Sequence, residues 1–247
     1  MSRVDVVLAV VLAVMGGVWA TLPAPLSARV VGPVDVSVVR LAEARAVLDT
    51  DAAVDVLVLG DSTGNALDEW PALWAGSFAA ERSVTVRQWD FNLERFAPEW
   101  SRLGGEGPGL RVWNLSQPGA RADYPVTRLG RVGAAPDLVL YSFGHNNTPD
   151  DIEAGLAATV EVVAGRWGSV PGVVVLQNPS TGALAARQAE TVERLREWAP
   201  VHGLGVVDVW SAFTAAGVPL GRLLMDVTHP NERGQRVWAA AVAEALG

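Results

Sequence analysis

Ser62 lies in the tripeptide Gly60-Asp61-Ser62, between the apolar segment 54–59 and a segment that is typical of a helix. A serine at such a turn points out of the end of a sheet, where a nucleophile can meet a substrate. Serine is a weak nucleophile until a base takes its proton, and His229 lies in a loop where its ring can act as that base. Asp226, three residues earlier, can accept a hydrogen bond from Nδ1 and fix the tautomer of the ring. These residues predict covalent catalysis by a serine with a histidine base.

Two further loops carry hydrogen-bond donors. Gly119 follows the predicted strand 112–115, and Asn146 follows the predicted strand 138–143. The carboxyl ends of parallel strands meet at one edge of a sheet, so we expect both residues beside Ser62. When a carbonyl is attacked, its oxygen becomes negative and needs donors that are already in place. The backbone N–H groups of Ser62 and Gly119 and the side-chain amide of Asn146 would supply three such donors.

The rest of the chain alternates strands with helices. Strands are predicted at 54–59, 84–89, 112–115, 138–143 and 173–177, with a short sixth candidate at 206–209. Helices are predicted within 29–49, after a linker, and at 66–80, 125–132, 150–167, 184–202 and 231–246. Strands rich in Val and Leu that alternate with helices indicate a parallel sheet covered on both faces, here in one domain of residues 29–247. The glycine-rich segment 91–109 is predicted to be an inserted loop.

Four blocks in this order resemble the SGNH (GDSL-type) hydrolase family: Gly60-Asp61-Ser62, Asn114 to Gly119, Gly144-His145-Asn146 and Asp226-Val227-Thr228-His229-Pro230-Asn231. The resemblance covers residue 54 to the end of the chain. It implies an α/β fold of the flavodoxin-like type, a three-layer α/β/α sandwich with a five-stranded parallel sheet. It also implies a catalytic triad of Ser62, Asp226 and His229, and an oxyanion hole of Ser62, Gly119 and Asn146, with no cofactor or metal. Thr63 and Asn147 depart from the usual family pattern, but neither is one of the four residues that give the family its name.

Several residues near the predicted site are candidates for substrate contact: Trp100, Arg121, His145 and Asn147, with Asp123 beside Arg121. A surface ion pair is the alternative for Arg121 and Asp123, and a solvated loop residue is the alternative for His145. The helical spacing of Trp70 and Trp74 predicts core residues.

Composition excludes several mechanisms and partners. The 247 residues contain no Cys and three His, and all 19 basic residues are Arg. Thiol nucleophiles, cysteine-ligated zinc, disulfides and lysine Schiff bases are therefore excluded, and a multi-histidine metal site is not expected. The net charge of −8 argues against nucleic acid or an anionic membrane surface as the main partner, since both require a basic face.

Residues 1–28 differ from the rest of the chain. Arg3 precedes a nearly unbroken apolar run at 6–20, and small residues follow it. This order is typical of a secretory signal peptide. An uncleaved membrane anchor and a buried helix of the domain are the alternatives, and the run is shorter than the roughly 20 residues of a spanning helix. We expect an extracytoplasmic protein, either secreted or attached to the membrane through this segment alone.

The predicted activity is that of a serine esterase, which hydrolyses a carboxylic ester through an acyl-enzyme on Ser62. The absence of a long apolar lid favours a short acyl group on a carbohydrate or envelope component, while lipid esters stay open. An O-acyltransferase with the same acyl-enzyme is one alternative. A non-catalytic extracytoplasmic binding module is an alternative from another class, which the presence of Ser62, Asp226 and His229 disfavours.

Overall fold

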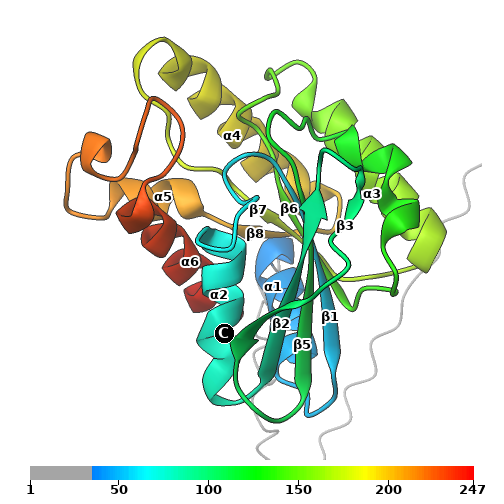
Figure 1. The fold of residues 1–247 in the computed structure, drawn as a ribbon. Coiled ribbons are helices and arrows are strands. Elements are labelled where there is room, and N and C mark those ends of the chain that lie inside the picture. The colour runs from blue at the N-terminus through cyan, green and yellow to red at the C-terminus, as the bar shows by residue number, and fades with distance from the viewer. Residues whose placement is uncertain (1–34) are drawn as a thin grey trace, which may run out of the picture. The chain divides into compact units, whose positions relative to one another are not determined.

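A computed structural model describes residues 35–247 of the chain (Figure 1). The predicted signal peptide or anchor, residues 1–28, lies outside the described residues. Among the helices that are described, none has the length and apolar character needed to cross a membrane.

The centre of the fold is an eight-stranded sheet. Six strands run parallel, in the spatial order β2 (Ser83–Asp90), β5 (Gly109–Ser116), β1 (Val54–Gly60), β6 (Leu138–Ser142), β7 (Gly172–Val175) and β8 (Gly205–Val207). The family resemblance implied five parallel strands. The sixth is β8, the short candidate strand of the sequence, which has its place in the sheet because it pairs with β7.

The segment 91–109 is not the irregular loop that its glycines predicted. It contains β3 (Arg95–Phe96) and β4 (Ser101–Gly104), and both pair antiparallel with β2. Because β2 is the outermost parallel strand on its side, its outer N–H and C=O groups are free to pair with the returning chain. The segment therefore extends the sheet.

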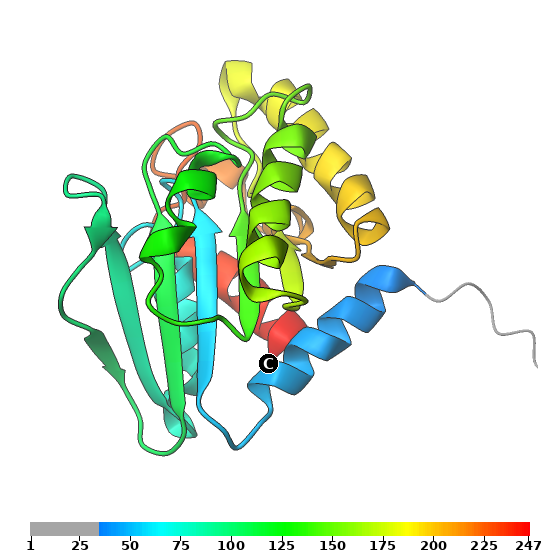
Figure 2. The same cartoon turned by 90° about the vertical axis from the view of Figure 1, so that its right-hand side faces the viewer.

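Helices cover both faces of the sheet, and α3 and α6 lie on opposite sides of it in Figures 1 and 2. Hydrophobic residues of β1 alternate between the two faces, with Val56 and Val58 in one core and Leu57 and Leu59 in the other. The first core includes α1 (Val36–Leu48), α2 (Trp70–Ser77), α5 (Val209–Thr214) and α6 (Glu232–Leu246). The second includes α3 (Ile152–Trp167) and α4 (Ala185–Val201). The predicted three-layer α/β/α sandwich is confirmed.

Two predicted helices differ in extent from the structure. The helix predicted at 66–80 begins only at Trp70, because residues 61–69 form the loop of Ser62 and Pro71 favours the first helical turn. The helix predicted at 125–132 is instead two 3₁₀ helices, Tyr124–Thr127 and Leu129–Arg131. Three further 3₁₀ helices span Phe78–Ala80, Gly182–Leu184 and Leu220–Arg222.

Three neighbouring strands end together at the carboxyl edge of the sheet. Gly60 at the end of β1 is paired with Ser116 of β5 on one side and with Ser142 of β6 on the other. The loops that follow these three residues carry the predicted nucleophile and both remaining oxyanion donors. The parallel register thus brings them to one place, as the sequence predicted.

Candidate active site

The predicted triad residues form a continuous hydrogen-bonded chain. The Oγ atom of Ser62 lies 2.8 Å from Nε2 of His229. The other ring nitrogen, Nδ1, lies 2.7 Å from Oδ2 of Asp226. A carboxylate can only accept, so Nδ1 carries the proton and donates it, which leaves Nε2 to accept from the serine hydroxyl. This is the tautomer in which a histidine can take a proton from serine.

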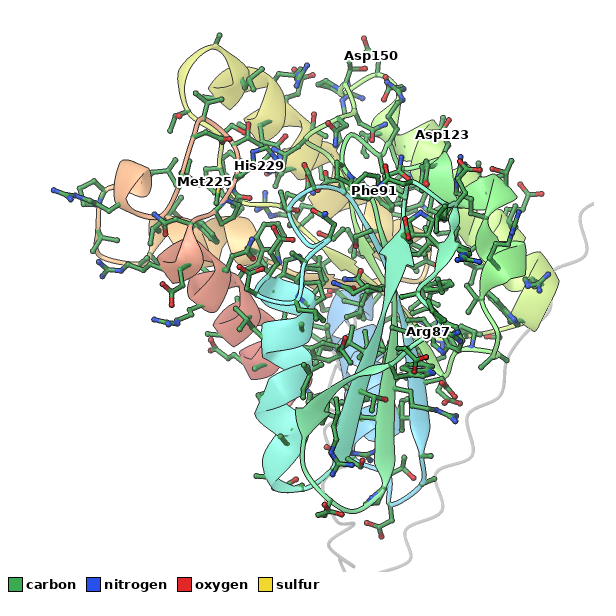
Figure 3. All side chains as sticks on the ribbon, in the orientation of Figure 1. Arg87, Phe91, Asp123, Asp150, Met225 and His229 are labelled. Atoms are coloured by element: carbon green, nitrogen blue, oxygen red, sulfur yellow. The ribbon has the colours of Figure 1, made fainter. Side chains whose placement is uncertain are left out.

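The loop that carries Met225 and His229, both labelled in Figure 3, is held by hydrogen bonds to its own side chains. Oδ1 of Asp226 accepts the backbone N–H groups of Thr228 and His229, each at 2.7 Å. Asn231 then caps α6 by accepting from the first backbone N–H groups of that helix. Asp and Asn are residues that stabilise turns and helix starts in this way, so the loop conformation follows from its local sequence.

The electrostatics of Asp226 suit its position beside the ring. Partial burial acts against its charged form, but hydrogen bonds from the backbone N–H groups of His229 and Thr228 and from the imidazole outweigh it, and they lower the pKa of the carboxyl group to about 2. Asp226 is therefore ionised at neutral pH and favours an imidazolium beside it.

The loops that follow β5 and β6 bring Gly119 and Asn146 close together. Gly119 has a φ of 74°, a left-handed conformation that glycine adopts without strain, and it is exposed. Nδ2 of Asn146 donates to the backbone oxygen of Ala120 at 3.1 Å and to Oδ2 of Asp61 at 3.3 Å. Both partners are acceptors only, so the amide must turn its nitrogen towards them. The structure thus brings a donor side chain to the two loops that hold Ser62 and Gly119.

Two buried glutamines, neither of which the sequence had singled out, connect these loops. Gln235 of α6 accepts from the backbone N–H of Trp70 at 2.9 Å and donates to the backbone oxygen of Thr63 at 3.1 Å. Gln177, which follows β7, donates to Oδ2 of Asp61 at 2.8 Å. In the sequence, Gln177 is an uncharged polar residue directly after an apolar run, and Gln235 lies between Gly234 and Arg236. Both patterns are too common to indicate a site.

Two residues predicted to contact substrate are instead buried in the framework. Asn147 is 1% exposed, and its amide accepts from the backbone N–H of Ala122 at 3.0 Å and donates to Asp151 at 2.7 Å. His145 is 7% exposed, so it is neither a solvated loop residue nor a surface that a substrate meets. Its Nε2 donates to Asn178 at 3.2 Å, and its Nδ1 accepts from Ser180 at 3.3 Å. Burial lowers the pKa of His145, so its neutral form is favoured.

The side chain of Trp100 also packs against side chains of the sheet. Its ring meets that of Trp113 edge-to-face with 4.8 Å between centroids, and Arg87 lies over it at 5.6 Å. Trp113 is paired with Leu57 in the middle of β1, five residues before Ser62. In Figure 3, Arg87 lies in the middle of the sheet, apart from the loop of His229. The prediction that Trp100 contacts substrate is therefore not supported.

Arg121 does lie beside the predicted oxyanion loop. A groove of about 330 Å³ begins at Gly119 and is lined by the polar side chains of Gln117, Arg121, Asp123, Tyr124 and Arg128. Arg121 forms an ion pair with Asp151 at 2.8 Å, and Arg128 forms one with Glu94 at 2.6 Å. The groove is thus polar, and its two guanidinium groups already have carboxylate partners. Within the described part of the chain, no three acidic or histidine side chains are grouped to hold a metal ion.

Comparison with known families agrees with this geometry. The model of the GDSL-like lipase/acylhydrolase family matches residues 58–237. The chain belongs to this family. A GDSL-like acylhydrolase of this kind is an SGNH-type serine hydrolase that acts on ester bonds, so the chain is an enzyme. No curated protein matches its sequence.

Solved structures share the fold of this GDSL-like acylhydrolase at low sequence identity. LAE5, an alpha/beta hydrolase from the metagenome of Lake Arreo, has a TM-score of 0.59 and 22% identity over 80% of this chain and 97% of its own. A carbohydrate esterase family 3 protein from Talaromyces cellulolyticus has a TM-score of 0.56 and 20% identity over 78% and 96%. Axe2, an acetylxylan esterase from Geobacillus stearothermophilus, has a TM-score of 0.55 and 16% identity over 80% and 96%. At these identities the likeness concerns the fold alone.

Proposed function

We propose that this enzyme hydrolyses carboxylic esters through an acyl-enzyme formed on Ser62. The observation that carries the proposal is the chain from Ser62 Oγ to His229 at 2.8 Å and from His229 to Asp226 at 2.7 Å. Oγ attacks the ester carbonyl while Nε2 takes its proton. The imidazolium then returns that proton to the departing alcohol as the C–O bond breaks. In the second half, His229 deprotonates a water, which attacks the acyl-enzyme and releases the acid and Ser62.

The negative oxygen of each tetrahedral intermediate is stabilised by three donors: the backbone N–H groups of Ser62 and Gly119 and the amide of Asn146. This assignment of the donors is supported by the position of Asn146, whose Nδ2 donates to Asp61 in the Ser62 loop and to Ala120 in the Gly119 loop. Its 3.3 Å contact with Asp61 is the weaker of the two, so it is the one that an oxyanion would replace. Removing one such donor commonly lowers turnover by about 10²–10³-fold.

The polar groove beside Gly119 supports a carbohydrate ester as substrate. Its arginines are paired with carboxylates, so it offers hydrogen bonds to hydroxyl groups and little net charge for an anion or apolar surface for a long chain. Two proteins of similar fold are by name a carbohydrate esterase and an acetylxylan esterase. We therefore propose a short acyl group, such as acetyl, carried by a sugar whose ring occupies the groove.

The test compares the purified wild type with Ser62→Ala and His229→Ala. We expect wild type to react with a fluorophosphonate probe and to hydrolyse p-nitrophenyl acetate, and both activities to be lost in Ser62→Ala. A folded wild type that neither reacts nor hydrolyses any ester would overturn the acyl-enzyme proposal. Activity on p-nitrophenyl acetate but on no acetylated sugar would overturn the substrate class alone. Transfer of the acetyl group to an added sugar, rather than to water, would identify an O-acyltransferase.

A further inference from the structure

Gln177 is fully buried and uses both ends of its amide beside the active site. Its Oε1 accepts the backbone N–H of His145 at 2.6 Å. Its Nε2 donates to Oδ2 of Asp61 at 2.8 Å, and lies 3.3 Å from the backbone oxygen of Ser142. One side chain thus joins the residue before the nucleophile to the residue before Asn146. Its orientation is fixed, because an N–H can only be met by the oxygen and a carboxylate only by the nitrogen.

The partner of Gln177, Asp61, is a carboxylate with no exposed surface. Its Oδ1 accepts from the backbone N–H of Thr63 at 3.0 Å and from the hydroxyl of that residue at 2.8 Å. Its Oδ2 accepts from Gln177 at 2.8 Å and from Asn146 at 3.3 Å. Among the described residues, no arginine forms an ion pair with Asp61, so its charge depends on these donors.

The two donors on Oδ2 are coupled through this shared acceptor. When an oxyanion forms, the amide of Asn146 has to loosen its contact with Asp61 in order to donate to the substrate oxygen. With Gln177 in place, Oδ2 keeps a short hydrogen bond, so the carboxylate is not left without a partner. Without Gln177, Asn146 would be the only donor to Oδ2, and the buried carboxylate would hold that amide in competition with the oxyanion.

We propose that Gln177 is a positioning residue that satisfies Asp61 and thereby leaves Asn146 available to the oxyanion. This inference rests on the proposed function, since it assigns Gln177 a part in transition-state stabilisation at the same site. The effect belongs to the transition state, in which the oxyanion carries its charge, and not to substrate binding.

The first test is Gln177→Met, which keeps the length of the side chain and removes both hydrogen bonds. We expect kcat for p-nitrophenyl acetate to fall about 10–100-fold, part of the loss of a whole oxyanion donor, while KM changes little. The rate of fluorophosphonate labelling should fall similarly. The matched control is Gln188→Met, because Gln188 is also buried and near Gly144 but its Nε2 has no hydrogen-bond partner. We expect kcat of the control to stay within about twofold of wild type.

The second test is Gln177→Glu, measured as kcat relative to wild type across pH. A protonated carboxyl group has the same hydrogen-bonding pattern as the amide, since it accepts at one oxygen and donates from the other. When ionised, it would instead repel Asp61. The charged groups around it are Asp61 and Arg187, which donates to the backbone oxygen of His145, and the titratable group is the neutral imidazole of His145. The proximity of a second carboxylate should raise the pKa of the introduced group, so the ratio to wild type should rise as pH falls.

The outcomes separate this inference from the proposed function. If wild type is active and Gln177→Met is folded with unchanged kcat, Gln177 has only a structural role and the inference is wrong. If Gln177→Met does not fold, Gln177→Glu decides, and a ratio to wild type that does not depend on pH would reject the inference. A wild type without labelling or turnover would reject the proposed function, and with it the inference.

Discussion

At the scale of single residues, the site depends on two aspartates whose carboxylates accept hydrogen bonds and thereby fix the orientation of the donor side chains. Asp226 orients the ring of His229, and Asp61 orients the amides of Asn146 and Gln177. Each carboxylate can only accept hydrogen bonds, so the side chains around it must turn their donor atoms towards it. Each of these side chains therefore has one orientation. The two aspartates are therefore the residues at which small chemical changes should have large effects.

Asp226→Asn is a sharp test of the triad. The substituted side chain keeps an oxygen for the backbone N–H groups of Thr228 and His229, so the loop should hold its shape. Its amide nitrogen cannot accept from Nδ1, so the ring should adopt the wrong tautomer. We expect kcat to fall by about 10³–10⁴-fold, with a melting temperature close to that of wild type. A loss of less than tenfold would show that Asp226 does not orient the base.

His145 should make the stability of the enzyme depend on pH. Burial lowers its pKa in the folded state below the ordinary value of 6.5. As pH falls below 6.5, the unfolded chain takes up a proton that the folded protein does not, so the free energy of unfolding should decrease, by at most about 1.4 kcal/mol per pH unit. Urea unfolding at pH 7.5 and 5.5 measures this decrease, and His145→Gln should show a smaller one. An equal decrease in the variant would assign the effect to other groups.

At the scale of elements, the packing of α2 against α6 brings the nucleophile loop to the histidine loop. Trp70 and Trp238 stack with 5.7 Å between ring centroids, and both rings are almost completely buried. Gln235, one turn before Trp238, binds the backbone at Thr63 and Trp70. The helix that follows His229 thus holds the loop that contains Ser62.

Trp238→Ala should test this packing. Truncating a buried Trp leaves a cavity and typically costs about 3–5 kcal/mol of folding free energy. The loops of Ser62 and His229 both depend on the stack of Trp70 on Trp238. We therefore expect a loss of kcat at temperatures where the variant is still folded. Urea unfolding and turnover of p-nitrophenyl acetate at 15 °C would measure the two effects. Trp74→Ala, in the same core but without the stack on α6, is the control, which should lose similar stability and less activity.

The sequence predicted the helices and strands better than the burial of individual side chains. The strands, the order of the loops and the position of Ser62, Gly119, Asn146 and the Asp226–His229 pair followed from local patterns and a parallel sheet. Burial did not, because it depends on residues distant in the chain. His145 and Asn147 looked like loop residues open to substrate, but the loop after β7 and the start of α3 cover them. The pairing of β3 and β4 with β2 was missed for the same reason.

At the scale of the whole molecule, the predicted export of the enzyme can be tested directly. Residues 1–34 fused to a reporter that is active only after export should give activity in a bacterial host. A fusion in which the apolar run 6–20 carries two arginines should not. The N-terminus and mass of the full chain recovered from the membrane and soluble fractions would then distinguish a cleaved signal from an anchor. An inactive first fusion would reject the prediction.

The edge strands of the sheet affect how the protein behaves in concentrated solution. On one side β2 is covered by β3 and β4, which are two and four residues long. On the other side β8 has three residues, and the backbone N–H of Val206 donates to Ser37 of α1 at 3.0 Å. Long unpaired strands are templates on which further chains polymerise into fibrils, and short or capped ones are not. Even at high concentration, the folded enzyme should therefore resist growth into amyloid-like assemblies.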